Sequence, residues 1–262
     1  MPSKGMRMPL RSFFALITCI GTLCSAPVWA ETIRLVQDEA YAPYMTKDGK
    51  QPTGIWAEVI TQALSRIEGD YDVVLEAVPW SRAVNLVESG QAHGLVGTYY
   101  KPDSRPWIGT YSTAPFTENV AVYCRDGVAE AGWSYPQDFK GLTFGNNAGF
   151  GTPGQAFFDL VASGLISLQE APTTDLNLKK LAAGRIDCYV QEQLTAEIAI
   201  TALGISGITQ VLDTSVENSM IGFRASWQGA EAEGFIAEMD RALAEMMADG
   251  TIDQIIATAV AG

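Results

Sequence analysis

One arginine stands in a run of turn-forming and aromatic residues, GTYYKPDSRPWIG, which spans residues 97–109. A guanidinium is planar, so it can hold a carboxylate through two parallel hydrogen bonds. In that interpretation Arg105 binds an anionic ligand. In the alternative interpretation Arg105 is a solvated charge on a loop. The elements that position this arginine decide between the two.

The first thirty residues predict a segment that does not belong to the fold. Basic residues precede an apolar run at 13–23, which is shorter than the ~20 residues needed to span a bilayer. The small residues Val28 and Ala30 then mark a cleavage site before Glu31. This pattern is typical of a secretory signal peptide over residues 1–30, so we expect an exported protein.

Composition excludes several classes of partner and site. The net charge is −13, and removal of the signal peptide, which holds three basic residues and no acid, takes it to −16. So acidic a chain is repelled by nucleic acid and by anionic membrane surfaces. The single histidine, His93, argues against a histidine-based zinc site, and we expect neither a metal nor a cofactor.

Apolar periodicity predicts two consecutive α/β units, each with a mostly parallel sheet flanked by helices. In the first unit we expect strands at 32–38, 71–78 and 92–99, separated by helices at 55–67 and 81–90. In the second we expect strands at 119–125, 142–151, 165–171 and 185–192, with helices at 152–164 and 174–184. Thr152 is the expected N-cap of the helix at 152–164. A strand at 220–225 and helices at 229–249 and 252–259 close the chain.

Ligands of open α/β sheets bind outside the carboxyl ends of the strands. Those ends carry polar, aromatic or glycine residues here: Asp38 with Tyr41, Gly97 with Thr98, residues 146–151, and Gln191 with Glu192. If the two units face each other, these ends line one cleft.

The order of the motifs resembles the family 3 extracellular solute-binding proteins, the periplasmic amino-acid-binding components of ABC importers. IRLVQDEAYAPY (33–44) is similar to the family's first strand and aromatic loop, and GIWAEVITQAL (54–64) to its first helix. GTYYKPDSR (97–105) is similar to a stretch that ends in T-x-x-R, and MADGTIDQIIATAV (247–260) to the C-terminal helix pair. The resemblance implies the α/β, two-lobed type II periplasmic binding protein fold.

The resemblance also implies a domain organisation and partners. Lobe 1 is expected at 31–116 and 219–262, lobe 2 at 120–213, and a two-strand hinge near 117–120 and 214–218. We expect a periplasmic monomer that delivers a small molecule, an amino acid or related amine, to an ABC transporter permease in the inner membrane.

By resemblance, Arg105 binds the α-carboxylate of the ligand, and Gly97 and Thr98 belong to a stretch that contacts the same group. Phe150 and Gly151 match a turn of the second lobe that also faces the ligand. The family often has serine or threonine where Phe150 stands, so one hydroxyl contact is missing.

Four further residues are assigned to the ligand by resemblance. Glu192 matches an aspartate that binds the ligand ammonium, Tyr41 and Trp80 match aromatic residues that enclose the ligand side chain, and Asp38 lies at the same mouth. The alternatives are an acid that favours a helix N-terminus for Glu192, ordinary packing for the two aromatics, and a turn cap for Asp38.

Two cysteines follow the signal peptide, and the implied fold places 119–125 antiparallel to 185–192. This placement favours a structural disulfide between Cys124 and Cys188, and two small buried apolar residues are the alternative.

Two other functions stay open. Some proteins with the implied fold are cyclohexadienyl dehydratases, in which case Glu192, paired with Lys101 or Arg105, is a candidate general acid. Other proteins with this fold act as ligand sensors that dock on receptors. A binding protein without enzymatic activity is the main prediction.

Overall fold

The structure is a computed structural model that describes residues 1–2, 5, 32–130 and 132–261, and residues 31–262 form one compact unit. Most of the predicted signal peptide, with its cleavage site, lies outside the described residues. No helix in the described part of the chain is long and apolar enough to cross a membrane.

A mixed β-sheet organises the unit, with strand order β10-β9-β11-β8-β12-β6-β1-β5 and β7 paired with β12. The first lobe, as we name it, contains the parallel strands β1 (Ile33–Asp38), β5 (Val73–Val78) and β6 (Gly94–Thr98). The second lobe contains the parallel strands β9 (Thr143–Asn147), β10 (Ser167–Ala171) and β11 (Cys188–Glu192). The predicted parallel α/β units are therefore present in both lobes.

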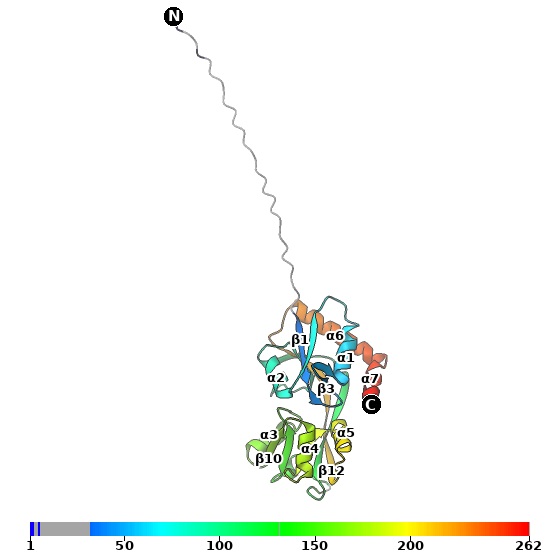
Figure 1. Cartoon of the computed structure of the whole chain (residues 1–262). Coiled ribbons are helices and arrows are strands. Elements are labelled where there is room, and N and C mark those ends of the chain that lie inside the picture. The colour runs from blue at the N-terminus through cyan, green and yellow to red at the C-terminus, as the bar shows by residue number, and fades with distance from the viewer. Residues whose placement is uncertain (3–4, 6–31, 131, 262) are drawn as a thin grey trace. The chain divides into compact units, whose positions relative to one another are not determined.

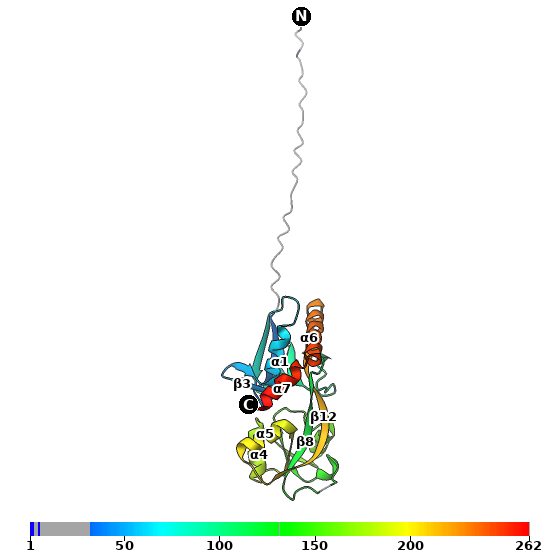
Figure 2. The same ribbon diagram turned by 90° about the vertical axis from the view of Figure 1, so that its right-hand side faces the viewer.

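Two long antiparallel strands, β8 (Phe116–Arg125) and β12 (Ile208–Arg224), run through both lobes, as Figures 1 and 2 show. β12 pairs with β8 over most of its length, then with β6 and with β7 (Ile108–Tyr111). The sequence predicted strands at 119–125, which is most of β8, and at 220–225, the end of β12, with a hinge near 117–120 and 214–218. Every residue of 208–218 is half-buried or exposed, so that stretch carries no apolar period that marks a strand.

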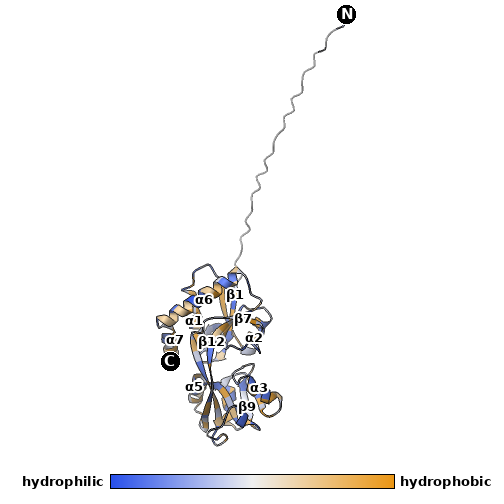
Figure 3. Ribbon diagram, turned by 180° about the vertical axis from the view of Figure 1, so that it is seen from behind, coloured by the Kyte–Doolittle hydropathy of each residue, from blue (hydrophilic) through white to orange (hydrophobic). Residues whose placement is uncertain are grey.

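Helices cover the sheet in both lobes (Figure 1). In the first lobe these are α1 (Ile55–Leu64), α2 (Trp80–Glu88), α6 (Ala230–Ala248) and α7 (Thr251–Ala261), together with a small meander of β2 (Ala40–Tyr41), β3 (Met45–Asp48) and β4 (Gln51–Thr53). In the second lobe they are η1 (Gln137–Phe139), α3 (Gln155–Ala162), α4 (Thr174–Ala182) and α5 (Gln193–Leu203). Hydrophilic and hydrophobic positions alternate along α6 (Figure 3), which buries residues at helical spacing: Ala232, Phe235, Met239, Ala242, Leu243 and Met246.

The start of α3 differs from the prediction. The helix begins at Gln155, not at the predicted Thr152, and its N-cap is Gly154. Gly154 has a φ of 81°, a conformation that glycine adopts without steric cost, and its N–H donates to Gly151 O at 3.1 Å. Residues 148–154 therefore remain a loop, and this loop reaches the interlobe site.

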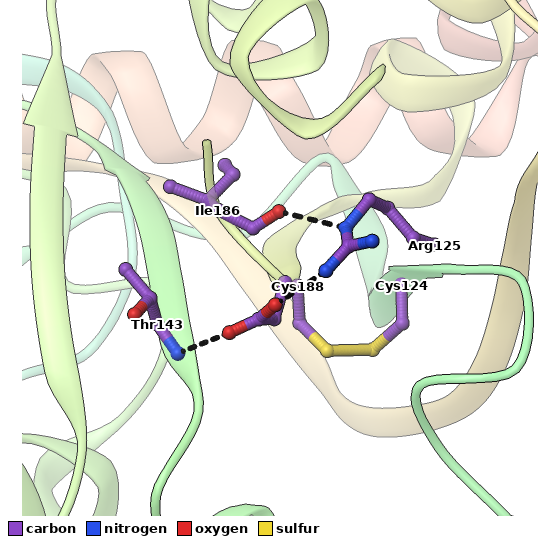
Figure 4. Close-up of a disulfide and its surroundings, with 6 residues drawn as sticks. Cys124, Arg125, Thr143, Ile186 and Cys188 are labelled. Atoms are coloured by element: carbon purple, nitrogen blue, oxygen red, sulfur yellow. Dashed lines mark hydrogen bonds and ion pairs between the residues drawn. A yellow bond between two sulfur atoms is a disulfide. The ribbon is translucent and has the colours of Figure 1, made fainter. Parts of the chain in front are cut away.

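Cys124 of β8 and Cys188 of β11 lie opposite each other in the antiparallel ladder and form a buried disulfide (Figure 4). Polar contacts surround it: Arg125 donates from Nη2 to Asp187 Oδ1 at 2.6 Å and from Nε to Ile186 O at 3.2 Å. Asp187 Oδ2 in turn accepts from Thr143 N at 2.9 Å. The disulfide and these bonds join β8, β9 and β11 at the end away from Glu192.

Replacing both cysteines by alanine is expected to lower the free energy of unfolding by about 3–4 kcal/mol, because a bridge across this sequence separation restricts the unfolded chain. The separation is 64 residues. Urea unfolding of residues 31–262 measures the effect, with reduced wild-type protein as the matched control. An unfolding midpoint shared by oxidised wild type and the double variant would contradict the expectation.

Candidate functional site

A small chamber lies between the carboxyl ends of the strands of the two lobes. Its free volume is about 20 Å³, and it is lined by Tyr41, Met45, Trp80, Gly97, Tyr99, Lys101, Arg105, Phe150, Gly151 and Thr152. The structure thus brings together six of the residues predicted to bind a ligand: Tyr41, Trp80, Gly97, Arg105, Phe150 and Gly151. The other three, Asp38, Thr98 and Glu192, are buried nearby but do not line the chamber.

Arg105 is not a solvated loop charge, because only 8% of its surface is exposed. Its Nη1 donates to Thr98 Oγ1, and its guanidinium carbon lies 5.3 Å from the centre of the Trp80 ring, a cation–π contact. None of the ion pairs within the described residues involves Arg105. Burial lowers the pKa of this guanidinium from its ordinary value. The chamber therefore contains a buried cation that has no carboxylate partner among the residues that the structure describes.

Gly97 and Thr98, at the end of β6, place this cation. Gly97 has a φ of 73°, and a Cβ added there would lie 2.5 Å from Met45 Cε, so only glycine fits beside the chamber. Thr98 is buried, and besides accepting from Arg105 its hydroxyl donates to Tyr99 O at 3.2 Å.

Aromatic rings from both lobes fill most of the chamber. Phe150 packs its ring against Tyr41, at a centroid distance of 5.4 Å and an interplanar angle of 82°, and against Trp80, at 5.5 Å and 64°. Trp80 Nε1 donates to Gly149 O at 3.1 Å. These contacts link the first lobe to the loop after β9 of the second.

Glu192 ends β11 and is the N-cap of α5. Its two carboxylate oxygens accept from Leu194 N at 3.0 Å and Thr195 N at 2.7 Å, and Tyr44 of the first lobe donates to Oε1 at 3.2 Å. Only 2% of its surface is exposed, and burial raises the pKa of the carboxyl from its ordinary value. Glu192 therefore caps the N-terminus of α5, which was the alternative interpretation from the sequence, but it does so as a buried acid and not as a surface acid.

Asp38, at the end of β1, accepts from Ala40 N at 3.1 Å through Oδ1, which is the turn cap foreseen as the alternative. Its surface is 4% exposed, and burial raises the pKa of the carboxyl to about 6.

The model of the bacterial extracellular solute-binding proteins, family 3, matches residues 33–260. The chain belongs to this family. No curated protein matches the sequence of this family 3 protein significantly.

Solved structures show the same fold, that of the type II periplasmic binding proteins. An ancestral arginine-binding protein bound to arginine has 20% identity and a TM-score of 0.70, over 87% of this chain and 97% of that one. A histidine kinase sensor domain has 19% identity and a TM-score of 0.70, over 87% and 96%. An ancestral amino-acid-binding protein, a precursor of cyclohexadienyl dehydratase, has 16% identity and a TM-score of 0.66, over 87% and 94%.

One buried acid of this family 3 protein escaped the sequence analysis. Glu118 of β8 is 1% exposed, and its Oε2 accepts from Tyr41 Oη at 2.5 Å and from Tyr99 Oη at 2.7 Å. Burial raises its pKa to about 7, against the lowering effect of hydrogen bonds from Tyr41, Ser219 and Tyr99. The sequence does not mark Glu118 as a site residue, because residues 117–120 (TENV) have the polar pattern of an ordinary strand edge.

The pairing predicted for a catalytic Glu192 is wrong. Lys101 Nζ binds Glu217 Oε1 at 3.0 Å, not Glu192, and Arg105 binds Thr98. Within the described residues, no group of three His, Cys, Asp or Glu side chains is arranged to hold a metal ion.

Two wider hollows accompany the chamber. One, of about 470 Å³, shares Lys101, Arg105, Phe150 and Gly151 with it, so we call this hollow the outer cleft. The other, of about 720 Å³, lies along α1 and α7, shares no residue with the chamber, and has Glu58 as the charged residue of its described lining. Convergent polar groups mark a ligand site better than volume does, so the chamber and outer cleft are the candidate site.

Proposed function

We propose that this chain is a periplasmic solute-binding protein that captures a small carboxylate-bearing ligand, an amino acid or a related amine, between its two lobes. The observation that carries the proposal is the buried Arg105 guanidinium, which reaches the interlobe chamber without an ion-pair partner among the described residues. A buried charge costs several kcal/mol unless it is paired, so this arrangement is expected of a site that receives its anion from outside.

The neighbouring residues complete a carboxylate clamp. The Arg105 guanidinium presents a planar fork of donors, Thr98 fixes one arm of it, and the glycine at 97 lets a ligand approach the backbone closely. Gly151 and the loop after β9 supply the second-lobe side of the same chamber.

The ligand amine has a proposed partner in Glu192. Its oxygens already accept two backbone N–H groups and the Tyr44 hydroxyl, but a carboxylate offers about four lone-pair sites, so capacity remains. Asp38 adds a second buried acid at the mouth of the cleft. Tyr41 and Trp80 then cover the body of the ligand.

The proposed function also includes export of the protein and delivery of its ligand to a transporter. Residues 1–30 act as a cleaved signal peptide, and residues 117–120 and 214–218 of the crossing strands act as the hinge between lobe 1 (31–116 and 219–262) and lobe 2 (120–213). A ligand that contacts both lobes favours the closed state, and a monomer in this state docks on an ABC transporter permease.

A thermal-shift screen of residues 31–262 against amino acids, amines, small carboxylates and prephenate tests this function. A ligand at ~100 times its dissociation constant adds about 2.7 kcal/mol, which is a rise of several degrees for a chain of this size. We expect the largest rise from a small carboxylate or amino acid. A rise with prephenate accompanied by turnover would support a dehydratase instead, and a rise with amines alone would contradict the carboxylate clamp.

A further inference from the structure

Phe150 occupies the place between Tyr41 and Trp80 that the proposed function assigns to the body of the ligand. Its ring contacts both of these aromatics edge-on, and only 9% of its surface is exposed. The protein therefore fills this part of its own chamber with a side chain from the second lobe.

The backbone around Phe150 is held in place. Its N–H donates to Asn147 O at 2.9 Å, and its carbonyl accepts from Asn146 Nδ2 at 2.9 Å. The preceding carbonyl, that of Gly149, accepts the bond from Trp80 Nε1. The ring is thus anchored to both lobes rather than loosely placed on a mobile loop.

The remaining space is too small for a ligand side chain. The chamber has about 20 Å³ of free volume, enough for about one water molecule. Arg105 nevertheless also borders the outer cleft, whose volume is about 470 Å³, so a carboxylate has a second approach to the guanidinium.

We infer that Phe150 is a specificity-determining residue: its ring fills the side-chain subsite, so the cleft accepts compact carboxylates and excludes amino acids with large side chains. The carboxylate part of this inference rests on the proposed function. The steric part rests on the ring contacts alone, and an uncharged aromatic probe tests it separately.

Phe150→Ala vacates the space beside Tyr41 and Trp80 that the ring fills. An apolar cavity of about 150 Å³ in a protein interior stays dry and binds benzene, so a vacated aromatic site is expected to take a phenyl ring. We expect L-phenylalanine to bind the variant at least ~10-fold more tightly than it binds wild type, the range that pocket shape controls. Benzene should raise the melting temperature of the variant and not that of wild type.

Isothermal titration of residues 31–262 with L-phenylalanine, and melting curves with benzene, provide the measurements. Trp133→Ala is the matched control, because Trp133 is a half-buried aromatic of the second lobe that packs edge-on against Phe139 and lines neither the chamber nor the outer cleft. It should leave both responses at the wild-type level. Phe150→Leu serves as a milder variant if alanine impairs folding, and it should give a smaller gain in the same direction.

The two probes separate the two hypotheses. If Phe150→Ala binds benzene but not L-phenylalanine, the result would support the steric role of the Phe150 ring and overturn the carboxylate clamp of Arg105. If neither folded variant, Phe150→Ala or Phe150→Leu, binds L-phenylalanine or benzene more tightly than wild type does, the steric role of the Phe150 ring would be overturned. Measurable binding of L-phenylalanine by wild type, with the same affinity as Phe150→Ala, would overturn it as well.

Discussion

Arg105→Met is expected to weaken the binding of carboxylate ligands by at least ~100-fold while the ligand-free protein stays folded. Each hydrogen bond to a charged group contributes about 1.5–3 kcal/mol, and a bidentate clamp contributes two of them. Methionine keeps the apolar contact with the Trp80 ring and removes all donors. The loss of binding therefore comes from the guanidinium and not from packing.

Stability is expected to move in the opposite direction to binding. The Arg105 charge is buried beside Trp80, without an ion pair among the described residues, and burial lowers its pKa. Replacing an uncompensated buried charge by an apolar side chain of similar length is neutral or stabilising. A residue with a merely structural role would instead lose stability and binding together.

Titration calorimetry with the best ligand of the screen, and urea unfolding without ligand, measure the two effects. Arg105→Lys keeps the charge but not the planar fork, so its affinity should fall between those of wild type and Arg105→Met. Arg82→Met removes an exposed arginine of α2 and is the control for net charge. Unchanged affinity in Arg105→Met would show that the carboxylate binds elsewhere.

Glu118→Gln is expected to stabilise the protein at pH 8 relative to wild type and to matter little near pH 4. The pKa of Glu118 is raised to about 7, mainly by burial, from an ordinary value of 4.5. Between these two values the folded protein keeps a proton that the unfolded chain has released. The folded state thus binds more protons, and the free energy of unfolding falls as the pH rises.

The window and size of this effect follow from the same pKa. In wild type, the contribution of protonated Glu118 to the free energy of unfolding is complete below about pH 4.5. This contribution declines up to about pH 7 and is absent above it, a change of roughly 3 kcal/mol at ~1.4 kcal/mol per pH unit. Asp38, whose pKa is raised to about 6, contributes in the same direction in both proteins and cancels in the difference. Glutamine has an oxygen that can still accept from Tyr41 and Tyr99, and it carries no charge.

Urea unfolding of wild type and Glu118→Gln at pH 5, 6, 7 and 8 measures this difference. We expect the advantage of the variant to grow from pH 5 to pH 7 and to level off by pH 8. Glu88→Gln, which removes an exposed carboxylate of α2, is the matched control. A difference between Glu118→Gln and wild type that does not change with pH would contradict the account of Glu118 as a buried proton site.

The sequence predicted those parts of the site that follow from local pattern. Asp38, Thr98 and Glu192 end the strands β1, β6 and β11 as expected, because a buried strand followed by a turn is legible in apolar periodicity. Arg105 was found as the one arginine in a turn between aromatics. These positions depend on neighbours a few residues away.

The missed parts depend on contacts between distant segments. Glu118 meets Tyr41 and Tyr99 only because β8 crosses between the lobes, and nothing local marks that meeting. Phe150 was foreseen at the site, but its ring faces Tyr41 and Trp80, which are 109 and 70 residues earlier in the chain. Sequence pattern identifies a residue at a strand end but does not say which residue of the opposite lobe it contacts.

The most direct test of the central claim is a crystal structure of residues 31–262 with the best ligand of the screen. The account predicts density for the ligand between the lobes, with its carboxylate within hydrogen-bonding distance of the Arg105 guanidinium and next to Thr98. A ligand bound in the hollow along α1 and α7, or one whose carboxylate faces Lys101 while Arg105 stays without an anion, would contradict it.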